Sequence, residues 1–263
     1  MNGAGNDFVL LDNRDGAIRL NRDQIVRLCH RQRGVGADGI MLLIPCASGK
    51  AAWAWDFHNS DGSVAEMCGN GARCFARYIR KLTGCQTPVT FETLAGVIRA
   101  EFPDDSRVTV NMTTPHDLRL NRRVPLSSGV IEAHSIDTGV PHAVIFEPAV
   151  EQARVVQTGA EIRYHAQFAP KGTNVNFVQA LGPNEIRVRT YERGVEGETL
   201  ACGTGVVASA LIAAAVRQFT SPVRVRSQGG DLLEVSFVQE DGQFRDVRLT
   251  GPAEFVFEGE IRI

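Results

Sequence analysis

Alternation of apolar and polar residues predicts that most of the chain folds into short β-strands. The candidate strands are NDFVLLD (6–12), GIMLLIP (39–45), AAWAWDF (51–57), VTFET (89–93), GVIRAEF (96–102), SRVTVNM (106–112), HAVIFE (142–147), NVNFVQA (174–180) and EIRVRTY (185–191). Near the C-terminus, LLEVSFV (232–238) and FRDVRLT (244–250) flank QEDGQ, a pattern that indicates a β-hairpin.

The first predicted helix begins after a capping box. Asn21 followed by Gln24 is the pattern that opens a helix, here RDQIVRLCHRQ, which we expect to end at Arg33. The next segment, GVGADG (34–39), fits the G-x-G-x-x-G pattern of dinucleotide-binding loops. That pattern works only between a strand and the helix it opens, whereas here a helix precedes it and a strand begins at Gly39. We therefore interpret GVGADG as a glycine turn near a pocket wall.

Two further helices each follow the tetrapeptide Cys-Gly-x-Gly. After MCGNGAR (67–73), apolar residues recur at helical spacing while Arg73, Arg77 and Arg80 fall elsewhere, which predicts an amphipathic helix. The second, GVVASALIAAAVRQ (205–218), is apolar nearly all round and is predicted to be buried on every side. Because strands outnumber helices, we expect an α+β protein in which each half is a sheet wrapped around one central helix.

Composition and charge narrow the classes of partner. With 263 residues and 43% hydrophobic residues, the chain can bury a substantial core. Its formal net charge of -2 and its lack of a long basic run do not favour a nucleic acid or an anionic membrane as partner, so a small molecule is expected. No apolar run is long enough to span a membrane, and MNGAGNDF lacks the pattern of a signal peptide. We therefore expect a cytoplasmic protein.

The six cysteines are expected to be reduced thiols in that compartment. Their even number does not predict a disulfide framework, and the lack of a Cys-x-x-Cys pair argues against a zinc site. No metal is expected. The cysteines are Cys29, Cys46, Cys68, Cys74, Cys85 and Cys202.

The repeated Cys-Gly-x-Gly places Cys68 and Cys202 where each could exchange a proton. A helix start carries unpaired N–H groups and partial positive charge, which stabilise a thiolate, and glycines leave the same N–H groups open to a carboxylate. Inverting a stereocentre through a planar carbanion needs a base on one face and an acid on the other. Two such cysteines on either side of one α-carbon would meet this need.

The repeat extends beyond the tetrapeptide. GAGNDFVLLD (3–12) and KGTNVNFVQA (171–180) both place glycine and asparagine before an apolar strand. Asn59 precedes Cys68 at nearly the spacing by which Glu192 precedes Cys202. Glycine and asparagine are also ordinary turn residues at strand starts. Together with the paired cysteines, however, these similarities suggest two related half-domains that face each other.

Several sequence blocks in order resemble those of the diaminopimelate epimerase family. The blocks are NGAGNDFVLLD, FHNSDGSVAEMCGNGARC, GVPHAV, GTNVNFV and RTYERGVEGETLACGTG, and the resemblance spans residues 2 to about 210. It implies cofactor-independent interconversion of LL- and meso-diaminopimelate, in lysine and peptidoglycan synthesis, by a homodimeric enzyme. It also implies two pseudo-symmetric domains, each a curved antiparallel sheet around a central helix: residues 1–114 with a returning strand at 250–263, and residues 115–249.

The resemblance also implies a role for each matching position. Cys68 and Cys202 match the proton-transferring cysteines, and His142 and Glu192 match the pair near the reacting centre. Residues that match the family's substrate-binding positions are Asn6, Asn59, Gly69, Asn70, Asn174, Glu192, Arg193, Gly203 and Thr204. A ligand with two carboxylates and two ammonium groups loses much hydration on burial, and such an Asn-rich site with one Arg and one Glu could replace it.

The chain departs from the family pattern at three places. Val140 stands where some members have Asn, and Gly39 stands where some have Gln, so two substrate contacts are lost or supplied differently. The chain is also expected to begin a few residues inside the usual first strand. These differences bear on substrate binding and leave the cysteine pair unaffected.

Three alternatives stay open at this point. The first is another cofactor-independent racemase of the same fold, such as a proline racemase, although proline has no distal group to engage Asn59, Asn174 and Arg193. The second is a pyridoxal-phosphate racemase, although no lysine lies in a phosphate-binding context. The third is a non-catalytic thiol redox or ligand-binding protein, which would not exchange an amino-acid α-proton with heavy water.

Overall fold

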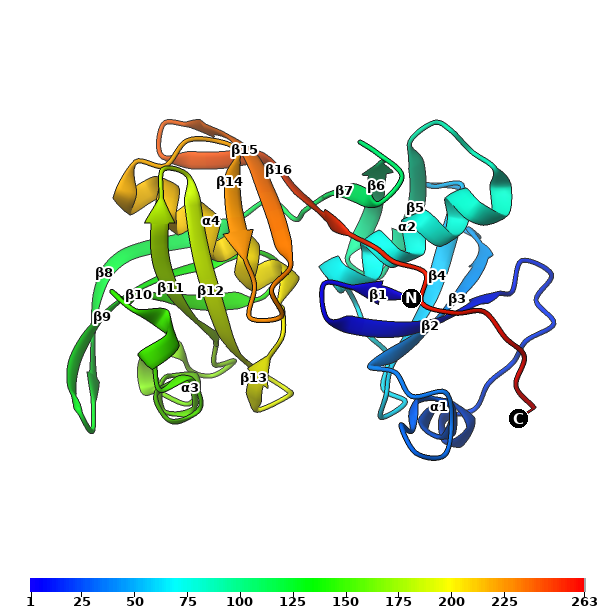
Figure 1. Cartoon of the computed structure of the whole chain (residues 1–263), viewed down its shortest axis with the longest axis horizontal. Helices are drawn as coiled ribbons and strands as arrows, with labels where there is room; N and C mark the ends of the chain where they lie inside the picture. Colours follow the sequence, from blue (N-terminus) through cyan, green and yellow to red (C-terminus); the bar gives the residue numbers. More distant parts are fainter. Residues whose placement is uncertain (263) are drawn as a thin grey trace. The chain divides into compact units, whose positions relative to one another are not determined.

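The computed structural model describes residues 1–262 and divides the chain into two compact units. One unit is Met1–Asn111 with Gly251–Ile263, and the other is Met112–Thr250 (Figure 1). Within residues 1–262, no helix is long and apolar enough to cross a lipid bilayer.

The first unit contains one mixed sheet and two helices. Its elements are β1 (Asn2–Gly3), β2 (Asn6–Asp12), α1 (Arg22–Cys29), β3 (Gly39–Pro45), β4 (Trp53–Asn59), α2 (Gly69–Thr83), β5 (Val89–Thr93), β6 (Gly96–Glu101) and β7 (Arg107–Asn111). The strands pair in sequence order. The pairs β2–β3 and β4–β5 are parallel, and the others are antiparallel.

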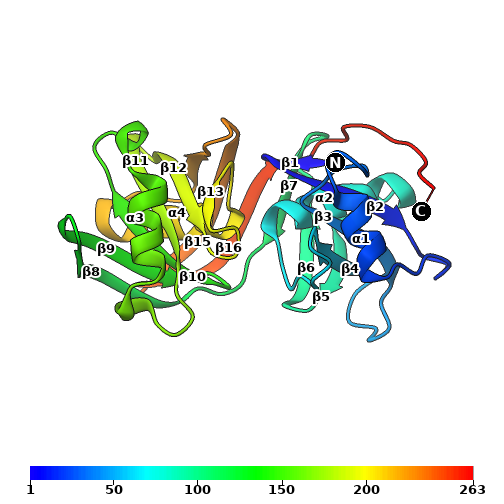
Figure 2. The same cartoon turned by 90° about the horizontal axis from the view of Figure 1, so that it is seen from below.

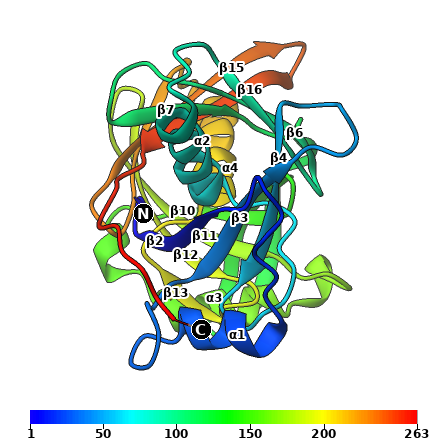
Figure 3. The same ribbon diagram turned by 90° about the vertical axis from the view of Figure 1, so that its right-hand side faces the viewer.

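Helices α1 and α2 lie on opposite faces of this sheet (Figure 3). The continuous apolar run of β3 explains this, because side chains of successive strand residues point to opposite faces and both faces are covered. Ile40 and Leu42 belong to the apolar cluster that includes residues of α1. On the face covered by α2, Phe75 contacts Trp55 at a ring-centroid distance of 5.7 Å.

The second unit contains a longer mixed sheet. Its elements are β8 (His116–Leu126), β9 (Gly129–Asp137), β10 (Pro141–Phe146), the 3-10 helices η1 (Val150–Gln152) and η2 (Ala166–Phe168), α3 (Val155–Arg163), β11 (Asn174–Gly182), β12 (Glu185–Glu192), β13 (Gly197–Thr199), α4 (Gly203–Arg217), β14 (Val223–Arg226), β15 (Leu232–Glu240) and β16 (Gln243–Pro252). The pairs β10–β11 and β12–β14 are parallel. Helix α3 packs against β11 and β12 (Figure 2), and their other face is turned to α4.

The two units repeat one topology. The order β2-β3-β4-β5-β6-β7 in the first unit matches β10-β11-β12-β14-β15-β16 in the second, with the same succession of parallel and antiparallel pairs. In each unit one helix follows the first of these strands, and the helix that begins after Cys-Gly-x-Gly follows the third. The expected α+β class is confirmed. The sheets are mixed rather than wholly antiparallel, because strands joined through a helix run parallel.

Most predicted strands lie where the sequence pattern places them, and the C-terminal hairpin is confirmed. Asp241 and Gly242 form its turn with φ angles of 49° and 75°, the left-handed conformation that Asp-Gly favours. The pattern missed β1, β8, β9, β13, β14 and α3. Strand β8 carries many basic and polar residues, so its apolar alternation is weak.

Helix α1 has the predicted capping box but ends early. Asn21 accepts from the Gln24 N–H, and the Gln24 side chain accepts from the Asn21 N–H. The expected end at Arg33 is wrong, because the helix ends at Cys29 and His30 is already extended. The backbone N–H groups of Val35 and Gly36 donate to Leu28 O, so the chain folds back over the helix end.

Helix α4 is buried along almost its whole length, as its composition predicts. Helix α2 departs from its prediction at Arg73, which the pattern places off the apolar face but which is fully buried. The Arg73 guanidinium donates to Asn70 Oδ1 at 2.9 Å, Gly69 O at 3.2 Å, Gly3 O at 3.4 Å and Pro252 O at 3.2 Å. Arg73 thus joins the start of α2 to the N-terminal turn and to the returning C-terminal segment.

Arg73→Ala should lower the free energy of unfolding by ~3 kcal/mol or more, because it leaves a cavity and deprives buried acceptors of their donor. Urea unfolding measures the loss. Arg80→Ala on the same helix is the matched control, since Arg80 pairs with the fully exposed Asp105, and it should cost about 1 kcal/mol or less. Equal losses for the two variants would contradict this account of Arg73.

Candidate active site

Cys68 caps the start of α2 in the first unit. Its backbone is extended, with φ −144° and ψ 118°, and its Sγ accepts from the Gly71 N–H at 3.4 Å. A Cβ at Gly71 would overlap Met41 Cε, so a side chain at this position would force the Met41 side chain on β3 to move. The positive end of the helix dipole and this N–H both favour the thiolate form of Cys68.

Asn6 and Asn70 are joined directly, although they are far apart in the sequence. Asn70 Nδ2 donates to Asn6 Oδ1 at 2.6 Å, and Asn6 Nδ2 donates to Asp38 Oδ2 at 2.8 Å. With Arg73 donating to Asn70 Oδ1, each amide has a fixed orientation. Asp38 was not among the predicted site residues. The sequence feature that could have identified Asp38 is its position: a carboxylate inside a glycine turn, directly before a buried strand.

An ion-pair group supports Asp38. Arg31 donates to Asp7 Oδ2 at 2.7 Å and to Asp38 Oδ1 at 2.8 Å. Burial by itself would raise the pKa of Asp7, but the hydrogen bonds and charge of Arg31 outweigh it and lower that pKa below its usual value. Asp7 therefore stays ionised at neutral pH, and Arg31 joins it to Asp38 in the glycine turn beside the start of β2.

Asn59 lies at the end of β4, where it pairs with Gly39 of β3. Its side chain donates to Ser63 Oγ at 3.0 Å in an exposed turn. Gly39 cannot carry a side chain in this structure, because a Cβ would lie 2.7 Å from His58 O. The close approach of β4 explains why glycine occupies this position. Sheet pairing thus places Asn59 beside the Asp38 turn that holds Asn6.

Cys202 occupies the N-cap position of α4 in the second unit and is 6% exposed. Its Sγ lies 3.6 Å from Thr204 Oγ1, which in turn lies 2.9 Å from His142 Nε2. Thr138 Oγ1 donates to Thr204 O at 3.0 Å and holds the backbone of the helix start. Gly203 is the first residue of α4, between Cys202 and Thr204.

His142 is a neutral imidazole. Its side chain is completely buried, and its Nδ1 lies 3.1 Å from Asn176 Nδ2. Burial, with a smaller effect from the positive charge of Arg193, lowers the pKa of His142 to about 3. At neutral pH the ring therefore carries one hydrogen and can both donate and accept a hydrogen bond.

Asn174, Glu192 and Arg193 gather at one end of the second sheet. His142 of β10 pairs with Asn174 of β11 in parallel register, and β12 runs antiparallel to β11 and ends beside its start. Asn174 Oδ1 accepts from the Arg193 N–H at 2.7 Å, and Glu192 Oε2 accepts from Thr199 Oγ1 at 3.0 Å. The Arg193 guanidinium donates to Lys171 O at 3.1 Å. The sheet thus brings together residues that the sequence separates.

The other four cysteines lie in different surroundings. Cys74 is fully buried behind Cys68 on α2, and burial raises the pKa of its thiol to about 12. Burial likewise raises the pKa of Cys29 to about 11. Cys46 contacts Glu92 Oε2 at 3.3 Å, and Cys85 contacts Thr87 Oγ1 at 3.0 Å near the surface. The two buried thiols stay protonated at neutral pH and cannot act as bases.

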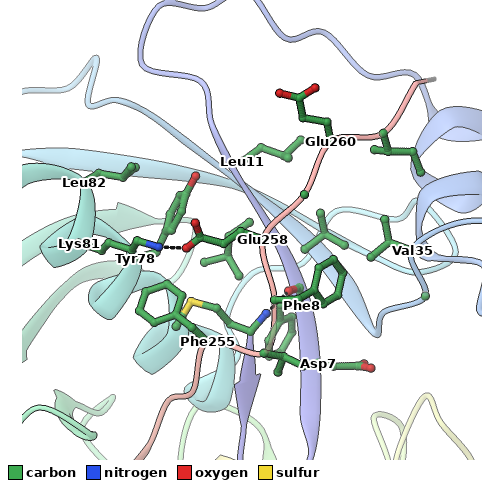
Figure 4. Close-up of a pocket in the computed structure, with 18 residues that line it drawn as sticks. Asp7, Phe8, Leu11, Val35, Tyr78, Lys81, Leu82, Phe255, Glu258 and Glu260 are labelled. Atoms are coloured by element: carbon green, nitrogen blue, oxygen red, sulfur yellow. Dashed lines mark hydrogen bonds and ion pairs between the residues drawn. The ribbon is translucent and has the colours of Figure 1, made fainter.

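The first unit contains a cavity of about 410 Å³, and Asp7 is among the residues that line it (Figure 4). It lies between β2, α2 and the C-terminal segment, with Leu11, Tyr78 and Phe255 among its walls, and Lys81 forms an ion pair with Glu258 across it. None of the predicted site residues is among the described residues that line this cavity.

Comparison with known sequences identifies similar proteins. The sequence profile of the family described as diaminopimelate epimerase matches residues 1–117 and 134–256. The diaminopimelate epimerase of Hydrogenobaculum sp. (strain Y04AAS1) is 42% identical over 268 residues, covering 98% of this chain and 95% of the relative. That of Aquifex aeolicus (strain VF5) is 41% identical over 272 residues, covering 99% and 96%. That of Chlorobaculum tepidum is 39% identical over 267 residues, covering 100% of both chains.

Comparison with solved structures supports the fold. A PhzF-family phenazine biosynthesis protein of Bacillus anthracis matches with a TM-score of 0.72 and 14% identity, covering 100% of this chain and 95% of that chain. A hydroxyproline epimerase of Agrobacterium vitis matches with a TM-score of 0.64 and 20% identity, covering 87% and 77%. At these identities the likeness concerns the fold alone, and it agrees with the expected two-domain α+β class.

The buried neutral state of His142 predicts a pH dependence of stability. Because its folded pKa of about 3 lies below the ordinary 6.5, the unfolded chain binds a proton in this window that the folded protein does not. The contribution of neutral His142 to the free energy of unfolding is therefore fully present above about pH 6.5. It is lost as the pH falls toward about 3, by at most ~1.4 kcal/mol per pH unit.

Urea unfolding across this range should show a steeper loss for the native protein than for His142→Gln, which lacks the titrating ring. NMR should show that the His142 ring does not titrate between about pH 8 and pH 5. A titration of His142 near neutral pH would contradict its buried neutral state.

Proposed function

The chain belongs to the diaminopimelate epimerase family of isomerases, and on this premise we propose that it interconverts LL- and meso-2,6-diaminopimelate without a cofactor, with Cys68 and Cys202 transferring the protons. One observation carries the proposal. In each unit, the helix that follows the third strand of the repeated topology begins with a capping cysteine and a Gly-x-Gly. The same reactive element therefore occurs once in each topological repeat.

The proposed reaction needs two groups of opposite protonation state. One cysteine, as thiolate, takes the hydrogen from the α-carbon, and the electrons of the broken C–H bond move into the adjacent carboxylate. The other cysteine, as thiol, gives its hydrogen to the opposite face of the planar carbon. The configuration is inverted and the two cysteines have exchanged protonation states. The reverse reaction uses the same groups with their roles exchanged.

The starts of α2 and α4 supply donors for the reacting carboxylate. Gly69, Asn70, Gly203 and Thr204 occupy the first turns, where backbone N–H groups have no partner within the helix. A carboxylate held there gains stabilisation as negative charge develops on it. The glycines keep this approach open, because a side chain in their place would shield the N–H groups.

Five polar residues are proposed to bind the rest of the substrate. Hydrogen bonds within the protein hold several of them in place: Asp38 accepts from Asn6 and orients it, and Asn174 accepts from the Arg193 N–H. A distal amino acid group carries one ammonium and one carboxylate, and Glu192 and Arg193 have the complementary charges. The residues are Asn6, Asn59, Asn174, Glu192 and Arg193. Cytoplasmic location and a homodimeric state stay predictions from the sequence.

The two-thiol mechanism predicts the origin of the hydrogen in the product. In heavy water, the newly formed epimer should carry deuterium at the inverted carbon from the first turnovers, because the delivering thiol has exchanged with solvent. Substrate recovered early should retain its protium, because a thiol that returns a hydrogen returns the original one. Mass spectrometry and proton NMR of both stereoisomers measure this distribution.

Cys68→Ala and Cys202→Ala should each abolish inversion, because one face loses its acid or base. Cys46→Ala is the matched control and should retain activity, since Cys46 contacts Glu92 near the surface. Early product dominated by protium, or a single-cysteine variant that still epimerises at a substantial rate, would sink the two-thiol mechanism. A native protein that exchanges no α-proton would instead favour a non-catalytic thiol protein.

Arg193→Ala should reduce kcat/KM for diaminopimelate by about 100-fold, because a buried substrate carboxylate would lose a charged donor. Arg187→Ala is the control, on the strand that ends just before Arg193; Arg187 pairs with Glu151 at the surface, and the kcat/KM of this variant should stay within about twofold of the native value. Steady-state kinetics with each stereoisomer measure both. Racemisation of lysine or proline at the same efficiency would show that the distal group is not recognised.

A further inference from the structure

A chain of hydrogen bonds in the second unit connects β12 to Cys202 through a residue that the sequence did not single out. Asn176 of β11 is fully buried. Thr190 Oγ1 donates to its Oδ1 at 2.9 Å, and its Nδ2 lies 3.0 Å from Ala143 O and 3.1 Å from His142 Nδ1. From His142 the chain continues through Thr204 to Cys202.

Donor and acceptor chemistry fixes the direction of the hydrogen bonds from Thr190 through Asn176 and His142 to Thr204. Ala143 O can only accept, so the amide nitrogen of Asn176, which can only donate, faces both Ala143 O and His142 Nδ1. His142 Nδ1 therefore bears no hydrogen. A neutral imidazole carries one hydrogen, which must lie on Nε2.

The same reasoning shows which partner remains for the Thr204 hydroxyl. His142 Nε2–H donates to Thr204 Oγ1, whose lone pair accepts it. The hydroxyl hydrogen can then be donated to Cys202 Sγ, 3.6 Å from the oxygen, when that sulfur is a thiolate with no hydrogen of its own. Hydrogen bonds to a charged acceptor are stronger than those to a neutral one, so this donor favours thiolate over thiol.

The start of α4 is shaped to admit Asn176. A Cβ at Gly205 would overlap Asn176 Oδ1, so glycine at this position lets the amide approach the first turn of the helix. The second glycine of Cys-Gly-x-Gly therefore has a function in this unit beyond opening the helix N–H groups. It leaves room for the residue that orients His142.

We propose that Asn176 is a positioning residue that selects the Nε2–H tautomer of His142 and so directs the Thr204 hydroxyl to stabilise the thiolate of Cys202. This inference rests on the proposed function, since a thiolate is the form that removes a proton. Cys68 receives a backbone N–H from Gly71 instead.

The tautomer can be measured in the native protein without substrate. In ¹⁵N NMR of labelled protein, the His142 ring should show a protonated Nε2 and an unprotonated Nδ1 at neutral pH. Asn176→Asp replaces the donor with an acceptor, so Nδ1 should become protonated. A native His142 with its hydrogen on Nδ1 would overturn the proposal.

The effect on Cys202 can be measured by alkylation. The rate of iodoacetamide labelling at each cysteine, mapped by mass spectrometry, follows the thiolate fraction as the pH is varied. The midpoint is the pH at which labelling of a cysteine reaches half of its maximal rate. Thr204→Val, which replaces the hydroxyl by a methyl group, should raise this midpoint for Cys202 by about one pH unit or more. Thr204→Ser should restore it. Cys46, which contacts Glu92 in the first unit, serves as the internal control, and Glu192 and Arg193, the charged groups at this end of the sheet, are unchanged.

The outcomes separate this inference from the proposed function. A Cys202 midpoint that is the same in Thr204→Val and in the native protein overturns the inference, whatever the activity. A native protein that shows the expected tautomer and midpoints but exchanges no α-proton supports the inference and contradicts the epimerase proposal. The native tautomer and the Thr204 variants give these answers even if Asn176→Asp does not fold.

Discussion

The start of a buried helix is the constraint on which each unit is built. Helices α2 and α4 are enclosed by their sheets, yet the first N–H groups of a helix have no partner within it and must be satisfied by neighbours or by a ligand. Glycines at 71 and 205 allow other residues to approach these ends closely. Around each helix start, strand ends and turns fill part of the space, and polar side chains are held in fixed orientations. The remaining space at the helix terminus stays open.

The two units meet this constraint with different chemistry on one topology. In the first, charged groups hold the asparagines: Arg73 orients Asn70, and Asp38 orients Asn6. In the second, uncharged groups do so, since His142 is neutral and Asn176 and Thr204 are its partners. A duplicated scaffold has therefore kept the position of its cysteine while the surroundings diverged. This asymmetry suits the proposed reaction, in which the two sulfurs start in opposite protonation states.

The sequence predicted the features that depend on local pattern. The apolar run of β3, the capping box at Asn21 and the hairpin turn at Asp241 are determined by near neighbours in the chain. Burial of Arg73 was missed because its acceptors at Gly3 and Pro252 are distant in sequence. Asp38 and Asn176 were missed for the same reason, since each acts through side chains that only sheet pairing brings near. The resemblance named the cysteines and asparagines of the site, but not the residues that orient them.

The first unit is assembled from both ends of the chain, which affects its folding during synthesis. Residues Met112–Thr250 form one continuous unit, which can fold as soon as it leaves the ribosome. The first unit is made earlier but lacks its C-terminal segment, so Arg73 has no Pro252 acceptor, and Arg77 no Ala253 acceptor, until residues 252 and 253 have left the ribosome. The second unit is therefore expected to reach its native state first. A nascent chain released before residue 251 would carry an unfinished first unit, and with it an unformed setting for Cys68.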